Sequence, residues 1–144
     1  MHPARDEWSH KVQVYRRSFR DIGRLLEVWS VADEEQWSDQ KIILRTGRIL
    51  ERVSGGGDGM GSLVRDINRH FNNVLVHLED DIPNIGPDNF RLYVYLAVGF
   101  NNDLIARLLG LRGKSILYSR KNRLKNRIRR VPSPRKDYYL ILIE

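Results

Sequence analysis

Apolar residues recur through the first part of the chain at the spacing of amphipathic helices. The longest series lies within residues 5–29 and alternates steps of four and three: Trp8, Val12, Tyr15, Phe19, Ile22, Leu26 and Trp29. This spacing places all of them on one face of a single helix. The face is rich in aromatic residues, unlike the Ile and Leu seam of a dimeric coiled coil. It suits packing against helices of the same chain as well as pairing between two chains.

Two more helices are predicted before a break near residue 80. The first covers about residues 32–53, and its acidic start at residues 33–35 suits the positive end of a helix dipole. Five glycines within residues 54–61 predict a flexible loop. The next helix covers about residues 62–78, with Ser62 as its N-cap and an apolar face of Leu63, Ile67, Phe71, Val74 and Leu78. A turn-rich segment then predicts a boundary between a helical scaffold, 1–80, and a second module, 81–144.

The second module has the layout of a helix-turn-helix. Pro87 suits the first turn of a helix that Gly99 ends. A short helix over residues 102–109, a tight connection at 110–113 and a longer basic helix over 114–129 follow. In this motif the longer helix enters the major groove of DNA. Residues 131–144 predict a Pro-kinked linker and a short apolar element, helix or strand. The fold class expected for the whole chain is all-α.

A helical wheel of residues 114–129 separates an inner side from an outer side. Ile116, Leu124 and Ile128 fall on the inner side, with Leu117 at its edge. The outer side carries Lys114, Tyr118, Lys121 and Lys125. Lysine can meet phosphates or guanine edges, and tyrosine can touch a thymine methyl group or donate to phosphate.

Charge is distributed unevenly along the chain. The net charge is +7, and residues 104–144 hold 12 of the 25 Lys and Arg residues but 2 of the 18 acidic ones. No Asp or Glu occurs between Leu104 and Lys136. Self-repulsion within such a segment is relieved by a polyanionic partner. The segment therefore favours binding to nucleic acid over a merely solvated surface.

Residues 99–128 resemble the LuxR-type helix-turn-helix domain. The resemblance rests on Gly99, Ile105-Ala106, Lys114-Ser-Ile116 and Arg120-Lys-Asn122. It is closest to the divergent version at the C-termini of Bacteroidetes regulators, whose run-in resembles His70-Phe-Asn-Asn73, Leu78 and Pro83. The clear match covers residues 88–128.

The resemblance implies a role for each matching position. It implies base contacts by Leu117, Tyr118 and Lys121, and contacts to phosphates or sugars by Asn102, Lys114, Ser115, Arg123 and Lys125. Arg112 stands where the family often has a serine that caps the recognition helix. Because an arginine cannot cap a helix N-terminus, we expect Arg112 to contact phosphate as well.

Other classes of site are disfavoured by the sequence. The chain has no cysteine, which excludes disulfides, zinc fingers and thiol catalysis. Residues 110–115 end like a phosphate-binding loop but have Leu108 where that motif needs glycine. His70 and His77 are seven residues apart and do not form a metal-binding pair. No apolar run approaches the roughly 18–20 residues of a membrane span. We expect a soluble, cytoplasmic protein without enzymatic activity, metal or cofactor.

The sequence thus predicts a transcriptional regulator that binds double-stranded DNA and forms a homodimer through its N-terminal helices. It is also compatible with a part of a larger regulator. The main alternative is a module for protein interaction or signal relay whose helix-turn-helix no longer binds DNA. A second alternative binds RNA by charge alone. Binding to duplex DNA that weakens with salt would distinguish the DNA-binding regulator from the first alternative. Competition between duplex DNA and single-stranded RNA would distinguish it from the second.

Overall fold

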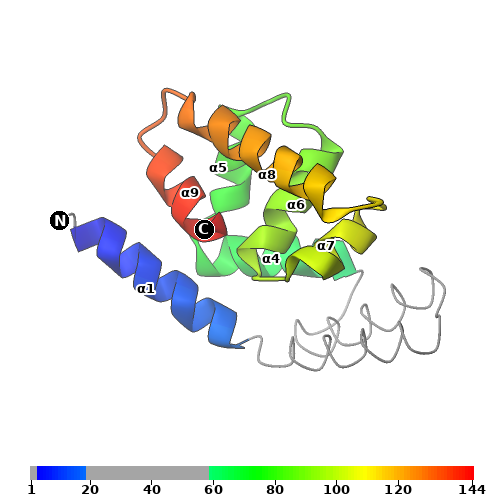
Figure 1. Ribbon diagram of the computed structural model, residues 1–144. Coiled ribbons are helices and arrows are strands. Elements are labelled where there is room, and N and C mark those ends of the chain that lie inside the picture. The colour runs from blue at the N-terminus through cyan, green and yellow to red at the C-terminus, as the bar shows by residue number, and fades with distance from the viewer. Residues whose placement is uncertain (1–2, 19–58) are drawn as a thin grey trace.

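The computed structural model describes residues 3–18 and 59–144, and every regular element in these two ranges is a helix (Figure 1). This confirms the all-α class. The helices are α1 (Pro3–Ser18), α4 (Gly59–His70), α5 (Val74–Asp81), α6 (Pro87–Ala97), α7 (Asn102–Leu108), α8 (Lys114–Arg129) and α9 (Lys136–Ile143). The helix predicted over residues 32–53 and the later part of the first predicted helix lie outside the described residues.

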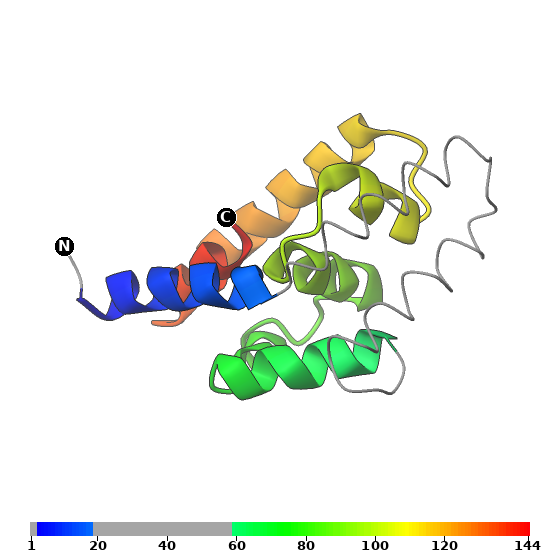
Figure 2. The ribbon, with the colours of Figure 1, turned by 90° about the horizontal axis from the view of Figure 1, so that it is seen from below.

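Helix α6 is the centre of the core. Residues 92–98 are buried without interruption, and α6 packs against α4, α7, α8 and α9. Figure 2 shows α6 between α4 on one side and α8 on the other. The buried side chains form one cluster that runs from Val12 to Ile143. The boundary predicted between residues 80 and 81 therefore falls inside a shared core.

The helix predicted over residues 62–78 is two helices, α4 and α5, which corrects that prediction. The chain turns at Asn72 and Asn73, whose φ angles are 54° and 60°. Asparagine tolerates this left-handed conformation better than most residues. The Asn73 amide donates to the Asn68 carbonyl (2.8 Å), and the Asn68 side chain accepts from the Leu75 amide (2.9 Å). The predicted apolar residues are nevertheless all buried, because the turn keeps both helices on the same side of the core.

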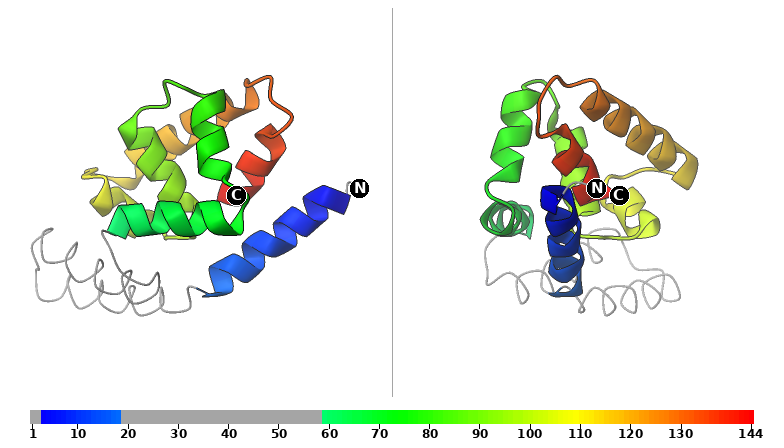
Figure 3. Two further views of the ribbon diagram at one scale, coloured as in Figure 1. Left: turned by 180° about the vertical axis from the view of Figure 1, so that it is seen from behind. Right: turned by 90° about the vertical axis from the view of Figure 1, so that its left-hand side faces the viewer.

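Helix α1 lies beside α9, which follows it by more than a hundred residues in the chain (Figure 3). The Trp8 indole N–H donates to the Tyr138 carbonyl (3.1 Å), and the Arg5 guanidinium pairs with the Asp137 carboxylate (2.6 Å). Val12 is buried. The first residues of the aromatic face thus pack within the chain, which was one of the two interpretations of its pattern.

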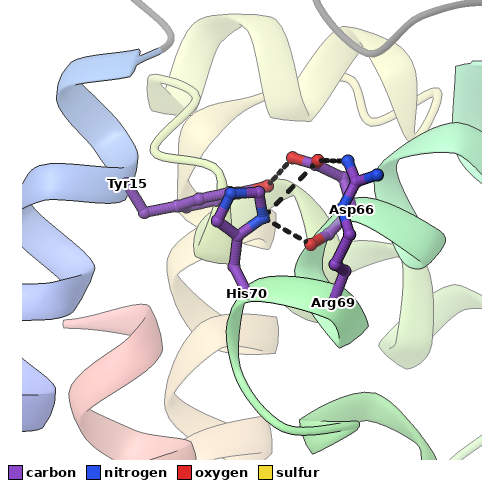
Figure 4. A network of polar contacts seen from close by, with 4 residues as sticks. All are labelled: Tyr15, Asp66, Arg69 and His70. Atoms are coloured by element: carbon purple, nitrogen blue, oxygen red, sulfur yellow. Dashed lines mark hydrogen bonds and ion pairs between the residues drawn. The ribbon is translucent and has the colours of Figure 1, made fainter.

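A polar network joins α1 to α4 (Figure 4). The Tyr15 hydroxyl donates to Asp66 Oδ2 (2.8 Å), and the Arg69 guanidinium donates to Asp66 Oδ1 (2.7 Å). His70 Nδ1 lies 2.9 Å from the Asp66 carbonyl. Burial, reinforced by the hydrogen bond to Asp66, raises the pKa of Tyr15 far above its usual value. The hydroxyl therefore remains a donor, and the buried carboxylate is satisfied from two helices.

The C-terminal segment is a helix, which resolves the choice between helix and strand. Tyr139, Leu142 and Ile143 of α9 are buried in the core. The Tyr93 hydroxyl donates to the Tyr139 carbonyl (2.9 Å), and the Tyr139 hydroxyl donates to Asp81 Oδ2 (2.5 Å). Helix α9 packs against α8 as well as α1. It therefore supports the long basic helix from behind.

Candidate nucleic-acid interface

Hydrogen bonds fix both ends of α7, and those at its C-terminal end form the turn that leads to α8. The Asn101 side chain accepts from the Leu104 amide (2.8 Å) and caps the start of α7. At the other end, the Leu111 amide donates to the Ala106 carbonyl (2.7 Å) and the Gly110 amide donates to the Arg107 carbonyl (2.9 Å). This is the Schellman pattern, and it needs the left-handed conformation that Gly110 adopts, with φ of 71°. The turn thus sets the angle at which α8 leaves.

Two arginines connect α7 and α8 to the surrounding helices. Arg91 of α6 donates to the Leu108 carbonyl at the end of α7 (3.1 Å). Arg127 of α8 donates to the carbonyl and the side-chain oxygen of Asn84 (2.7 Å each), in the loop before α6. These contacts tie both helices of the motif to the scaffold around α6.

The rotation of α8 about its axis differs from the sequence-based wheel. Leu117, Leu124 and Ile128 are its buried residues, with exposed fractions of 0%, 1% and 0%. Ile116, which was expected to face inward, is 43% exposed. Leu117 precedes Leu124 by two helical turns, so the two lie on the same line and Ile116 lies off it.

The base contact implied for Leu117 is therefore wrong. Its side chain is fully enclosed between α8 and the rest of the core, and no groove edge can reach it without unpacking the helix. Leu117 instead holds the N-terminal half of α8 in place. Tyr118, the next residue, keeps an exposed position, with 47% of its surface accessible.

Lys121 and Asn102 are brought together rather than left free for DNA. The Lys121 ammonium donates to Asn102 Oδ1 (3.1 Å) and lies 5.9 Å from the centre of the Tyr118 ring. Burial and, secondly, the neighbouring Lys125 lower the pKa of Lys121. Both predicted contact residues are half-buried, at the seam where α7 packs on α8. In the free protein, Lys121 and Asn102 thus connect α8 to α7.

Lys114 also has a partner on α7. Its ammonium lies 3.0 Å from Asp103 Oδ1, and this hydrogen bond raises the pKa of Lys114. Arg112 and Ser115 are exposed on either side of it. Asp103, Arg112 and Lys114 line a cleft of about 260 Å³ at the turn. The start of α8 thus presents cations beside the helix N-terminus.

A second cleft lies on the opposite flank of α8, against the start of α6. Its volume is about 460 Å³, and its lining includes Arg120, Arg123 and Arg127 of α8 together with Asp88 and Asn89 of α6. Arg123 is exposed as expected. Arg120 and Arg127 were not singled out from the sequence, although their spacing of seven residues placed them on one side of the helix.

Seven Lys and Arg residues and no acidic residue lie in α8 itself. Lys125 is half-buried on the flank that carries Lys121, and the three arginines occupy the other flank. The helix therefore carries positive charge along both flanks. Such an arrangement can attract a polyanion from either side.

No helix in the described part of the chain is long and apolar enough to cross a membrane. Within residues 3–18 and 59–144 there is also no group of three potential metal-ligating residues. Comparisons of the chain with family models, with curated proteins and with solved structures found no match.

Proposed function

We propose that this protein is a cytoplasmic transcriptional regulator, rather than an enzyme, and that α8 binds in the major groove of duplex DNA. The observation that carries the proposal is the position of α8: a helix without acidic residues that is held on the outside of the molecule by α6, α7 and α9. A helix of this kind fits the major groove, which is about 12 Å wide. Cations on its flanks would meet the phosphates on both sides.

The same arrangement favours DNA over a protein partner. A helix that binds a protein groove presents apolar anchor residues at helical spacing. The exposed surface of α8 has two large apolar or aromatic side chains, Ile116 and Tyr118, and otherwise polar or positive ones. A single-stranded RNA would need an exposed aromatic platform for stacked bases, and Tyr118 alone offers little of one.

The test is binding of a labelled DNA duplex as the salt concentration is raised from about 50 to 200 mM. We expect the logarithm of the affinity to fall linearly with that of the salt concentration, by about 0.9 for each phosphate neutralised. Arg123→Gln should make this slope shallower by roughly one unit. Lys11→Gln is the matched control, because it removes one exposed charge from α1, which lies away from α8. Absence of binding to any duplex would refute the proposal, and tighter binding to single-stranded RNA would favour the RNA alternative.

Homodimer formation belongs to the same proposal. Regulators of this class commonly place two copies on two half-sites. Trp8, Val12 and Tyr15 pack within the chain, and the rest of the aromatic face lies outside the described residues. Sedimentation of the full chain at tens of micromolar tests homodimer formation, and a monomer at that concentration would refute it.

A further inference from the structure

The buried residues of α8 define which side chains lie farthest from the core. Leu117, Leu124 and Ile128 point inward, and one residue advances the helix by about 100°. Four positions of α8 lie within about 40° of the direction that points away from the core. These crest residues are all exposed and all uncharged: Ser115, Ser119, Asn122 and Asn126. The cations of α8 lie on the two flanks beside them.

This order of side chains matches the cross-section of a DNA groove. An α-helix with its side chains is about 10–12 Å across, and the major groove is about 12 Å wide. When such a helix enters the groove, its flanks face the phosphates and its crest faces the base edges. The positive side chains on the flanks therefore attract the phosphates, while the neutral polar side chains on the crest are left to recognise the bases.

Asn122 has the side chain best placed for readout. Asn126, one turn later, already accepts a hydrogen bond on Oδ1 from Arg129 (2.9 Å). Asn102 and Asn84 are likewise engaged, by Lys121 and Arg127. The Asn122 side chain takes part in none of the hydrogen bonds found in the described part of the chain, and it is exposed. Both its donor and its acceptor are available.

We infer that Asn122 is a specificity-determining residue and that it recognises adenine. The inference rests on the proposed binding of α8 to duplex DNA. The amide of asparagine offers an acceptor to adenine N6–H and a donor to adenine N7, and adenine is the only single base that presents both a donor and an acceptor on its major-groove edge. Ser119 lies about one turn away on the crest, and its hydroxyl can add a hydrogen bond to a neighbouring base, either as donor or as acceptor.

The experiment is selection of bound sequences from a random duplex library by the full chain and three variants. The wild type should enrich a motif that contains an adenine. Asn122→Ala should lose the preference at that adenine alone, with binding to the selected site weakened about 5- to 150-fold. Asn122→Asp should shift the preference toward cytosine, whose N4–H₂ group donates to a carboxylate. Gln13→Ala is the matched control, because it removes an exposed side-chain amide from α1, away from α8, and it should keep the motif.

The outcomes separate the inference from the function on which it rests. A wild type that binds duplexes but whose motif is unchanged in both Asn122 variants overturns the inference and leaves DNA binding intact. A motif without adenine at the position that responds to Asn122 also overturns it. A wild type that binds no duplex refutes the proposed function itself. Because Asn122 is exposed, circular dichroism should show the same fold in all four proteins.

Discussion

Leu117→Ala distinguishes a core residue from a base contact. The substitution removes three carbon atoms from a side chain that is 0% exposed. The three carbon groups no longer contribute their hydrophobic free energy of burial, which is about 2 kcal/mol at roughly 0.8 kcal/mol per methylene. The cavity that remains lowers the stability further. We expect the free energy of unfolding to fall by about 2–5 kcal/mol. This is a large part of the roughly 5–15 kcal/mol that stabilises a typical domain.

Ile116→Ala is the control for this experiment, since it shortens the neighbouring side chain, which is 43% exposed. Less apolar surface is lost there, and alanine favours the helix slightly more than isoleucine, so we expect a change of less than about 1 kcal/mol. Urea denaturation followed by circular dichroism measures both values as a shift in midpoint at constant slope.

The reasoning fails if Leu117→Ala unfolds at the wild-type midpoint. A variant that keeps its stability but loses preference for one base pair would restore the base contact implied by the family resemblance. Equal destabilisation by both alanine variants would show that the rotation of α8 about its axis is incorrect. Each result is read from the same pair of proteins.

Three further predictions concern other parts of the fold. Tyr15→Phe should lower the free energy of unfolding by about 1–3 kcal/mol, because buried Asp66 loses a hydrogen bond; an unaltered urea midpoint would argue against this contact in solution. Asp81→Asn should make stability less sensitive to acid. The hydrogen bond from Tyr139 lowers the pKa of Asp81, so its contribution is present above about pH 4 and is lost as the pH falls further; parallel acid titrations of variant and wild type would contradict this. Gly110→Ala should cost about 1–2 kcal/mol, because its φ of 71° strains any side chain, whereas Gly113→Ser, at a φ of −169°, should leave the melting temperature unchanged.

The helices of the second module could be predicted from the sequence because their ends carry local signals. Pro87 begins α6, and Gly99 and Gly110 end α6 and α7 in left-handed conformations. Proline suits the first turn of a helix, and glycine adopts the left-handed conformation after a helix end at little cost, so these residues mark the boundaries here. The turn within residues 62–78 was missed because asparagine marks it less distinctly than glycine, and the apolar spacing runs through it unbroken.

The contact residues were harder to predict than the helices. The sequence shows which residues of α8 are charged, but whether Lys114 and Lys121 are free depends on Asp103 and Asn102 of another helix. The rotation of α8 depends on which of two adjacent apolar residues, Ile116 or Leu117, finds space in the core. Packing decides that choice, and a wheel weights both equally.

The pairing of α1 with α9 sets the order in which the molecule matures during translation. The Trp8 indole and the carbonyl to which it donates are separated by 130 residues. At roughly 5–20 residues per second, about 6.5–26 s pass between the synthesis of these two residues. Throughout that interval α1 can meet α4, where Tyr15 bonds to Asp66, but it lacks α9, and the side of α1 that α9 covers is open to chaperones or to other nascent chains. Of the described helices, α1 precedes all the others in the chain, yet its burial is complete only after α9 has been made.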